Sequence, residues 1–222
     1  MKTKYFTLIL VLISFKLYSQ LSIELEIRNS LAYITVKNNS TDAYLLPIDT
    51  KHLRPFENVC NNFSEQEIEF PSLALMLDFT TRDNKRESYV EGHLSINDFE
   101  IIKNRINEKR EKEKKKIEKW KSHYGLKNYN EALINYNVVN NLIFLKPKEK
   151  KQFFIKIDLH NITSQELLFY NYLLDQNEHY MVNLKYCNID INKYLTSDQK
   201  SKFKKYKIFS NELKSNFVKW NW

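Results

Sequence analysis

The clearest pattern along the chain is an alternation of hydrophobic and polar positions every two residues. In the stretch 32–37 (AYITVK), Ala32, Ile34 and Val36 are separated by more polar residues, as in a strand with one buried face. Residues 38–42 are short and polar, and residues of this kind turn the chain readily. Because an apolar run ending at Pro47 follows, this stretch predicts the strand–turn–strand unit of an antiparallel β-domain.

The same alternation recurs on both sides of a central charged segment. In the stretch 71–81 (PSLALMLDFTT), Ala74 and Met76 make the second face partly apolar, so we expect this strand to be central in its sheet. Further strands are predicted at 21–27, 87–93, 142–145, 153–159 and 180–186.

Between the strands, the hydrophobic period changes to that of a helix. Asn97 or Asp98 can cap a helix that begins near Phe99, and Gly125 is a suitable residue to end it. The middle of this helix has almost no apolar face, so only its two ends are expected to dock. Shorter helices are predicted at 129–136, 164–168 and 197–205, and the helical insertion as a whole at about 97–136.

These patterns predict a mainly β protein in which residues 20–222 form one antiparallel β-sandwich with an inserted long charged α-helix. Three stretches, LSIELEIRNSLAYITVKNNSTDAYLLP, LKPKEKKQFFIKIDL and HYMVNLKYCNID, give the chain a further likeness. Through them it resembles the exported immunoglobulin-like β-sandwich proteins of Gram-negative bacteria. Such domains often carry Pro-Gly before the strand that matches FFIKIDL, where this chain has Pro147 and Lys148. The resemblance implies an immunoglobulin-like fold and an envelope location, and it brings no catalytic residues.

The first residues have the layout of a secretory signal peptide. Lys2 and Lys4 precede a mostly apolar run from Tyr5 to Phe15, and Ser19 offers a cleavage point before Gln20. The run is shorter than the roughly 20 residues that span a bilayer, although an uncleaved anchor remains the alternative. We therefore predict that residues 1–19 are removed, and that the mature chain is periplasmic or secreted without a transmembrane span.

Positive charge is concentrated in the predicted long helix. Residues 103–121 hold ten Lys or Arg and four Glu, whereas the whole chain carries a formal charge of +8. Such a helix could contact an anionic partner, or it could be a solvated face with no partner. Nucleic acid is not expected as the partner of an exported chain. The candidate contact residues are Lys109, Arg110, Lys112, Lys114, Lys115 and Lys116.

Cysteine, glycine and histidine restrict the chemistry that the chain can carry. In an exported protein, the two cysteines, Cys60 and Cys187, suggest one disulfide. The two glycines, Gly92 and Gly125, are too few for a phosphate-binding loop, a dinucleotide fold or a nucleophile elbow. The five histidines show neither helical i, i+4 spacing nor an HExxH motif. We therefore predict no catalytic, cofactor-binding or metal-binding residues.

Three functions follow from the sequence. The leading one is a non-catalytic binding or structural protein of the bacterial envelope, whose partner is an unknown protein or envelope component. The second is a binder of an envelope surface or anionic partner through the helix at 103–121. The third is a hydrolase without a recognisable motif, for which Glu65, Glu67 and Glu69 are the nearest candidates for acid–base chemistry.

Overall fold

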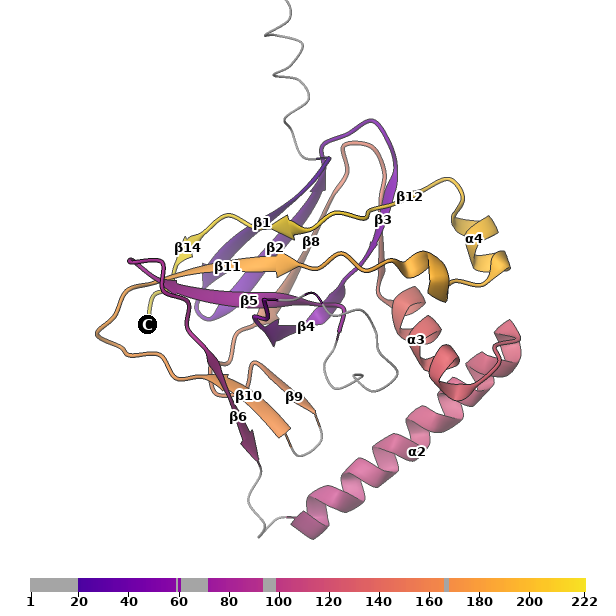
Figure 1. The fold of residues 1–222 in the computed structure, drawn as a ribbon, viewed down its shortest axis with the longest axis horizontal. Helices are drawn as coiled ribbons and strands as arrows, with labels where there is room; N and C mark the ends of the chain where they lie inside the picture. Colours follow the sequence, from indigo (N-terminus) through magenta and orange to yellow (C-terminus); the bar gives the residue numbers. More distant parts are fainter. Residues whose placement is uncertain (1–19, 59, 61–71, 94–98, 166–167) are drawn as a thin grey trace, which may run out of the picture.

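The computed structural model describes residues 20–58, 60, 72–93, 99–165 and 168–222 (Figure 1). Strands account for 39% and helices for 26% of the structure, which confirms the prediction of a mainly β protein with inserted helices. The predicted signal peptide at 1–19 and the candidate acids Glu65, Glu67 and Glu69 lie outside the described residues. Among the described helices, none has the length and apolar character that crossing a membrane requires.

The first sheet contains the stretch from which the sequence prediction began. Strand β1 pairs with β2, and β2 pairs with β8, both antiparallel. Asn29 and Ser30 join β1 to β2 with φ values of 49° and 58°, as the two central residues of a type I′ hairpin turn require. The bounds are β1 Leu21–Arg28, β2 Leu31–Asn38 and β8 Lys150–Lys156.

The second sheet packs against the first through a shared hydrophobic core. Alternate residues of β1 and β2, such as Ile23 and Ile34, lie in one buried cluster with Leu77 and Phe79 of β5 and Val182 of β11. The strand order is β13–β11–β5–β4, and β14 also pairs with β11. The bounds are β4 Asp49–Pro55, β5 Ala74–Thr81, β11 Tyr180–Tyr186, β13 Leu213–Lys214 and β14 Val218–Lys219.

Two smaller sheets complete the β structure. One has the order β12–β3–β7 and the other β6–β10–β9. The bounds are β3 Tyr44–Pro47, β7 Leu142–Leu145, β12 Lys207–Ile208, β6 Tyr89–His93, β9 Thr163–Gln165 and β10 Leu168–Tyr172.

The strand pairing departs from the sequence prediction in two respects. The sheets are not wholly antiparallel, because β4 pairs with β5 and β12 pairs with β3 in parallel. The short helix expected at 164–168 is wrong: Ser164 of β9 pairs with Phe169 of β10 in an antiparallel ladder. The pairing of β9 with β10, which β6 pairs on its other side, outweighs a local capping signal.

The helices between β6 and β7 form an arm on the outside of the sheets (Figure 1). Gly125 has φ of +63° directly after the long helix, so the predicted helix stop is confirmed. The second helix continues to Asn140, four residues beyond its predicted end, and β7 begins after the C-cap residue Asn141. The bounds are α2 Phe99–Tyr124, α3 Tyr129–Asn140, the 3₁₀ helix η2 Ile191–Tyr194 and α4 Ser197–Phe203.

Candidate functional site

The outer face of the second sheet carries a row of polar side chains that are buried. In the ladder between β5 and β11, Asp78 lies opposite Asn183, and Lys185 lies opposite Met76. Arg54 of β4 also lies opposite Met76, on the other side of β5. The exposed fractions of Arg54, Asp78 and Asn183 are 3%, 2% and 2%. Charged groups are rarely buried so completely without partners, so we expect these side chains to have partners within the chain.

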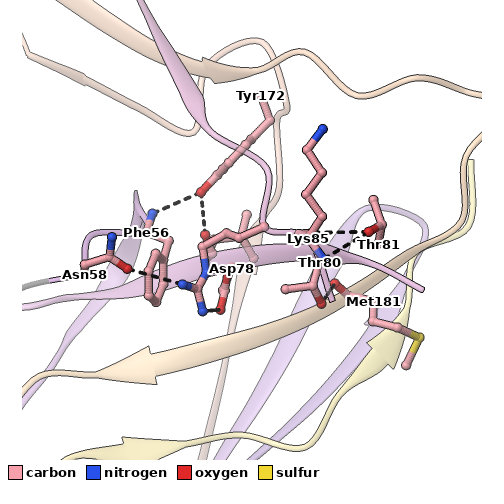
Figure 2. Close-up of polar contacts among 10 residues, drawn as sticks. Phe56, Asn58, Asp78, Thr80, Thr81, Lys85, Tyr172 and Met181 are labelled. Atoms are coloured by element: carbon pink, nitrogen blue, oxygen red, sulfur yellow. Dashed lines mark hydrogen bonds and ion pairs between the residues drawn. The ribbon is translucent and has the colours of Figure 1, made fainter. Parts of the chain in front are cut away.

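A segment after β4 covers part of this face, and we call it the strap (Phe56, Glu57, Asn58 and Cys60). Arg86 joins the strap to the sheet through hydrogen bonds to Asn58 and Asp78, both labelled in Figure 2. Its Nε donates to Asp78 Oδ1 at 2.6 Å and its Nη2 to Asp78 Oδ2 at 3.1 Å. The same guanidinium donates to Asn58 Oδ1 at 3.2 Å and lies over the Phe56 ring, 3.8 Å from its centroid. One cation therefore neutralises the buried carboxylate and binds two strap residues.

Tyr172 of β10 holds the strap from the other side (Figure 2). Its hydroxyl donates to the Leu77 carbonyl at 2.7 Å and accepts from the Phe56 N–H at 3.0 Å. Burial raises the pKa of this hydroxyl, so it stays protonated and can keep donating. The same group thus connects β10, β5 and the strap.

The remaining cations of this face also have carboxylate partners. Arg54 Nη1 lies 3.6 Å from Glu57 Oε2, and Lys185 Nζ lies 3.4 Å from Glu212 Oε2. Burial lowers the pKa of Arg54, while the Glu57 charge opposes that change. Arg54 Nε and Asn183 Oδ1 have no hydrogen-bond partner within the described part of the chain. With the Arg86–Asp78 pair, each cation faces one carboxylate, as buried charges require.

The predicted disulfide between Cys60 and Cys187 is present and ties the strap to the end of β11. The two Cα atoms are 5.4 Å apart, and the bond joins residues separated by 127 positions. Cys187 is buried on the polar side of the sheet, with its Sγ 3.6 Å from Arg54 Nη2.

These contacts hold the strap against the sheet, and the charged groups of the face are paired with one another. Each of the carboxylates, Glu57, Asp78 and Glu212, lies within ion-pair distance of a cation. Within the described ranges, no group of three or more His, Cys, Asp or Glu side chains is placed to hold a metal ion. Sequence reasoning missed this network. Its one signal was Asp78, a carboxylate in the middle of the apolar run 71–81.

The predicted basic residues all lie on α2, but they do not share one face. Successive residues of an α-helix turn by about 100°, which places Lys109, Lys112, Lys115 and Lys116 on one stripe and Arg110 and Lys114 on another. Four of the six candidates, Lys109, Lys112, Lys114 and Lys115, are exposed and occur in none of the ion pairs among the described residues. Lys116 lies over the ring of Tyr136, 4.6 Å from its centroid.

The C-terminal half of α2 is anchored, and its central part is not. Ile117 is fully buried, and the Trp120 indole donates to Asn135 Oδ1 of α3 at 2.8 Å. Of residues 103–116, Ile106 alone is partly buried and the rest are exposed. The structure thus presents a charged helical segment to solvent from a fixed base.

Comparison of the chain with protein family models, curated proteins and solved structures finds no match. Function must therefore be argued from the geometry of the chain itself.

Proposed function

We propose that the chain is an exported, non-catalytic binding or structural protein of the bacterial envelope, built on an immunoglobulin-like β-sandwich. The shared core of the first two sheets is what such a sandwich needs, although the parallel pairs add to the usual pattern. The disulfide supports export, because such bonds persist in oxidising compartments. The apolar run near the N-terminus supports the same location.

The observation that carries the proposal is how the buried polar groups are used. The charges of Arg54, Asp78, Arg86 and Lys185 each have a partner of opposite charge within the chain, and the contacts of Arg54 and Arg86 hold the strap. A scaffold that presents surfaces to a partner needs this rigidity. An enzyme would need at least one such group free to react.

The second candidate function is binding of an anionic partner through α2. The exposed side chains of the segment 103–116 favour this function. Apart from Ile106, which is partly buried, these side chains contribute no buried surface to the fold. A partner rich in phosphate or carboxylate would be attracted by this charge, and the attraction would weaken as salt rises.

Capture of partners from an envelope extract of the host tests both candidates. We expect the wild-type chain to retain a partner at moderate salt. The variant Lys112→Gln/Lys114→Gln/Lys115→Gln separates the two, because loss of the partner would assign binding to α2. The matched control is Lys200→Gln/Lys202→Gln/Lys204→Gln, which removes as many exposed charges from the α4 region. Turnover by the mature chain in a broad hydrolase screen would contradict both candidates.

A further inference from the structure

The β1–β2–β8 sheet has two edges, and hydrogen bonds from other described segments close only one of them. At β1, the Leu25 N–H donates to Asn216 Oδ1 at 2.8 Å, and Asn216 Nδ2 donates to the Leu25 carbonyl at 3.0 Å. Ile23 also forms a parallel bridge with Ser215. The Asn216 amide therefore takes the place of a neighbouring strand at this edge.

The other edge, at β8, has open backbone groups. At the two ends of the β2–β8 ladder, Ile157 N–H donates to the Ser30 carbonyl at 2.7 Å and Asn38 N–H to the Glu149 carbonyl at 2.9 Å. Hydrogen bonding alternates along an antiparallel pair, so the odd-numbered residues of β8 face β2. The backbone groups of Gln152 and Phe154 thus point outward, and no described residue bonds to them.

The open edge also displays an aromatic surface. Phe154 is 66% exposed, and its ring centroid is 6.3 Å from that of Tyr33 on β2. The 7 residues of β8 contain no proline, and their register with β2 is unbroken. β4 approaches β8 without pairing with it, and an edge of this length and regularity is a template for another strand.

The charges at this edge indicate which strand it accepts. Lys150, Lys151 and Lys156 are exposed, have no ion pair among the described residues, and are accompanied by no acid in β8. A second copy of β8, paired antiparallel about Phe153, would set Lys150 opposite Lys156 of the other copy. Like charges in that position repel, so the lysines disfavour self-pairing and favour an acidic strand.

We propose that the outer edge of β8 binds an extended acidic segment of another protein by strand addition. The proposal rests on the binding function above and adds the chemical class of the partner. The backbone of Gln152 and Phe154 would supply affinity, while the lysines and Phe154 would select acidic and apolar side chains.

A proline at position 152 tests the backbone contribution. Gln152 N–H points away from β2, so Gln152→Pro removes an outward donor without breaking the β2–β8 ladder. Gln152→Ala is the matched control, because it loses the same side chain and keeps the N–H. The probe is a labelled peptide of glutamate alternating with valine, as long as the 7 residues of β8. A lysine–valine peptide controls for charge.

We expect Gln152→Pro to weaken binding of the acidic peptide about tenfold or more, and Gln152→Ala to change it less than about twofold. Phe154→Ala should also weaken binding, while Phe217→Ala, a Phe that is 55% exposed elsewhere, should not. Circular dichroism and the urea midpoint establish that each variant folds. If Gln152→Pro does not fold, the comparison of Phe154→Ala with Phe217→Ala decides.

Equal binding by wild type and Gln152→Pro, or equal binding of the lysine peptide, would overturn the proposal. So would a wild-type dimer that Gln152→Pro converts to a monomer, because a second copy would then occupy the edge. If the captured envelope partner survives Gln152→Pro and is lost with the α2 triple variant, the edge proposal fails and the binding function stands. If no envelope partner is captured while the peptide discriminates as expected, the envelope function loses support and the edge proposal stands.

Discussion

At the scale of single residues, the structure holds two buried tyrosines that differ in one respect. Tyr172 is 1% exposed and its hydroxyl makes two hydrogen bonds. Tyr186 is 2% exposed and its hydroxyl has no partner in the described part of the chain. Burial raises the pKa of both phenols. Comparing the two tyrosines therefore distinguishes the contribution of a hydrogen-bonded hydroxyl to stability from the contribution of burial.

We expect Tyr172→Phe to lower the free energy of unfolding by about 1–3 kcal/mol, because it leaves the Leu77 carbonyl and the Phe56 N–H unpaired. Tyr186→Phe should be neutral or slightly stabilising, because it removes an unsatisfied polar atom. Urea unfolding of both variants measures the difference. Equal effects would show that the hydroxyl of Tyr172 contributes nothing to holding the strap.

A second residue-scale feature is the Asp49–His52 pair in the irregular part of β4. His52 Nδ1 lies 2.8 Å from Asp49 Oδ2, and this contact raises the pKa of His52 above 6.5 against the effect of burial. Burial of Asp49 acts to raise its pKa, but the His52 hydrogen bond, with backbone donors, outweighs it and the pKa is lowered. The charge of Lys109 on α2 acts to lower the pKa of His52.

The pH dependence of stability follows from these directions. The raised pKa of His52 stabilises the fold below pH 6.5, and this contribution is lost as pH rises through the folded pKa. The lowered pKa of Asp49 stabilises the fold above pH 3.8, and this contribution is lost as pH falls through the pKa of Asp49 in the folded state. The stability difference between wild type and His52→Gln should therefore be largest at mildly acidic pH and shrink towards pH 8.

An NMR titration of the His52 ring measures the same interaction directly. We expect a midpoint above 6.5 in the wild type, a lower one in Asp49→Asn, and a higher one in Lys109→Gln. An unchanged midpoint in Asp49→Asn would show that the pair does not form in solution.

At the scale of elements, one asparagine joins four helices. Asn135 of α3 is fully buried and accepts from the Trp120 indole of α2. Its Nδ2 donates to the Tyr194 carbonyl of η2 at 2.6 Å and to Gln199 Oε1 of α4 at 2.7 Å. Gln199 Nε2 returns a bond to Asn135 Oδ1 at 3.0 Å. The position of the helical arm therefore depends on a polar contact as well as on Ile117.

We expect Asn135→Ala to lower the free energy of unfolding by about 3 kcal/mol or more, since each buried polar group left unpaired costs about 1–3 kcal/mol. The Trp120 indole N–H should also exchange faster with solvent. Asn140→Ala, at an exposed position of the same helix, is the control and should change neither quantity. Slow exchange of the indole in Asn135→Ala would contradict this role.

The sequence predicted the helices and strands better than it predicted which of them lie side by side. The alternation at 32–37 and the stop at Gly125 are local signals, and both correspond to the structure. The strap network has one local signal, Asp78, because its other residues come from separate parts of the chain and meet only in the folded protein. The β9–β10 pair was missed because β10 also pairs with β6, which is distant in sequence, whereas the local sequence at Ser164 favoured a helix cap.

At the scale of the whole molecule, the disulfide is the covalent cross-link between distant parts of the described chain. The double variant Cys60→Ser/Cys187→Ser should be about 2–4 kcal/mol less stable, because the bond closes a long loop in the unfolded chain. Urea unfolding of wild type and double variant measures this. A thiol titration of the unreduced wild type is the accompanying check. Two titratable thiols would show that the bond does not form.

The disulfide also determines what a protease can release from the protein. The exposed part of α2 lies between Cys60 and Cys187, so it belongs to a covalently closed ring. A protease that cuts the arm there opens the ring but frees no fragment. The nicked molecule should migrate as one band on a denaturing gel and separate into two after a reducing agent is added. A cut in α2 would thus break the helical arm while the disulfide keeps the two parts of the chain joined.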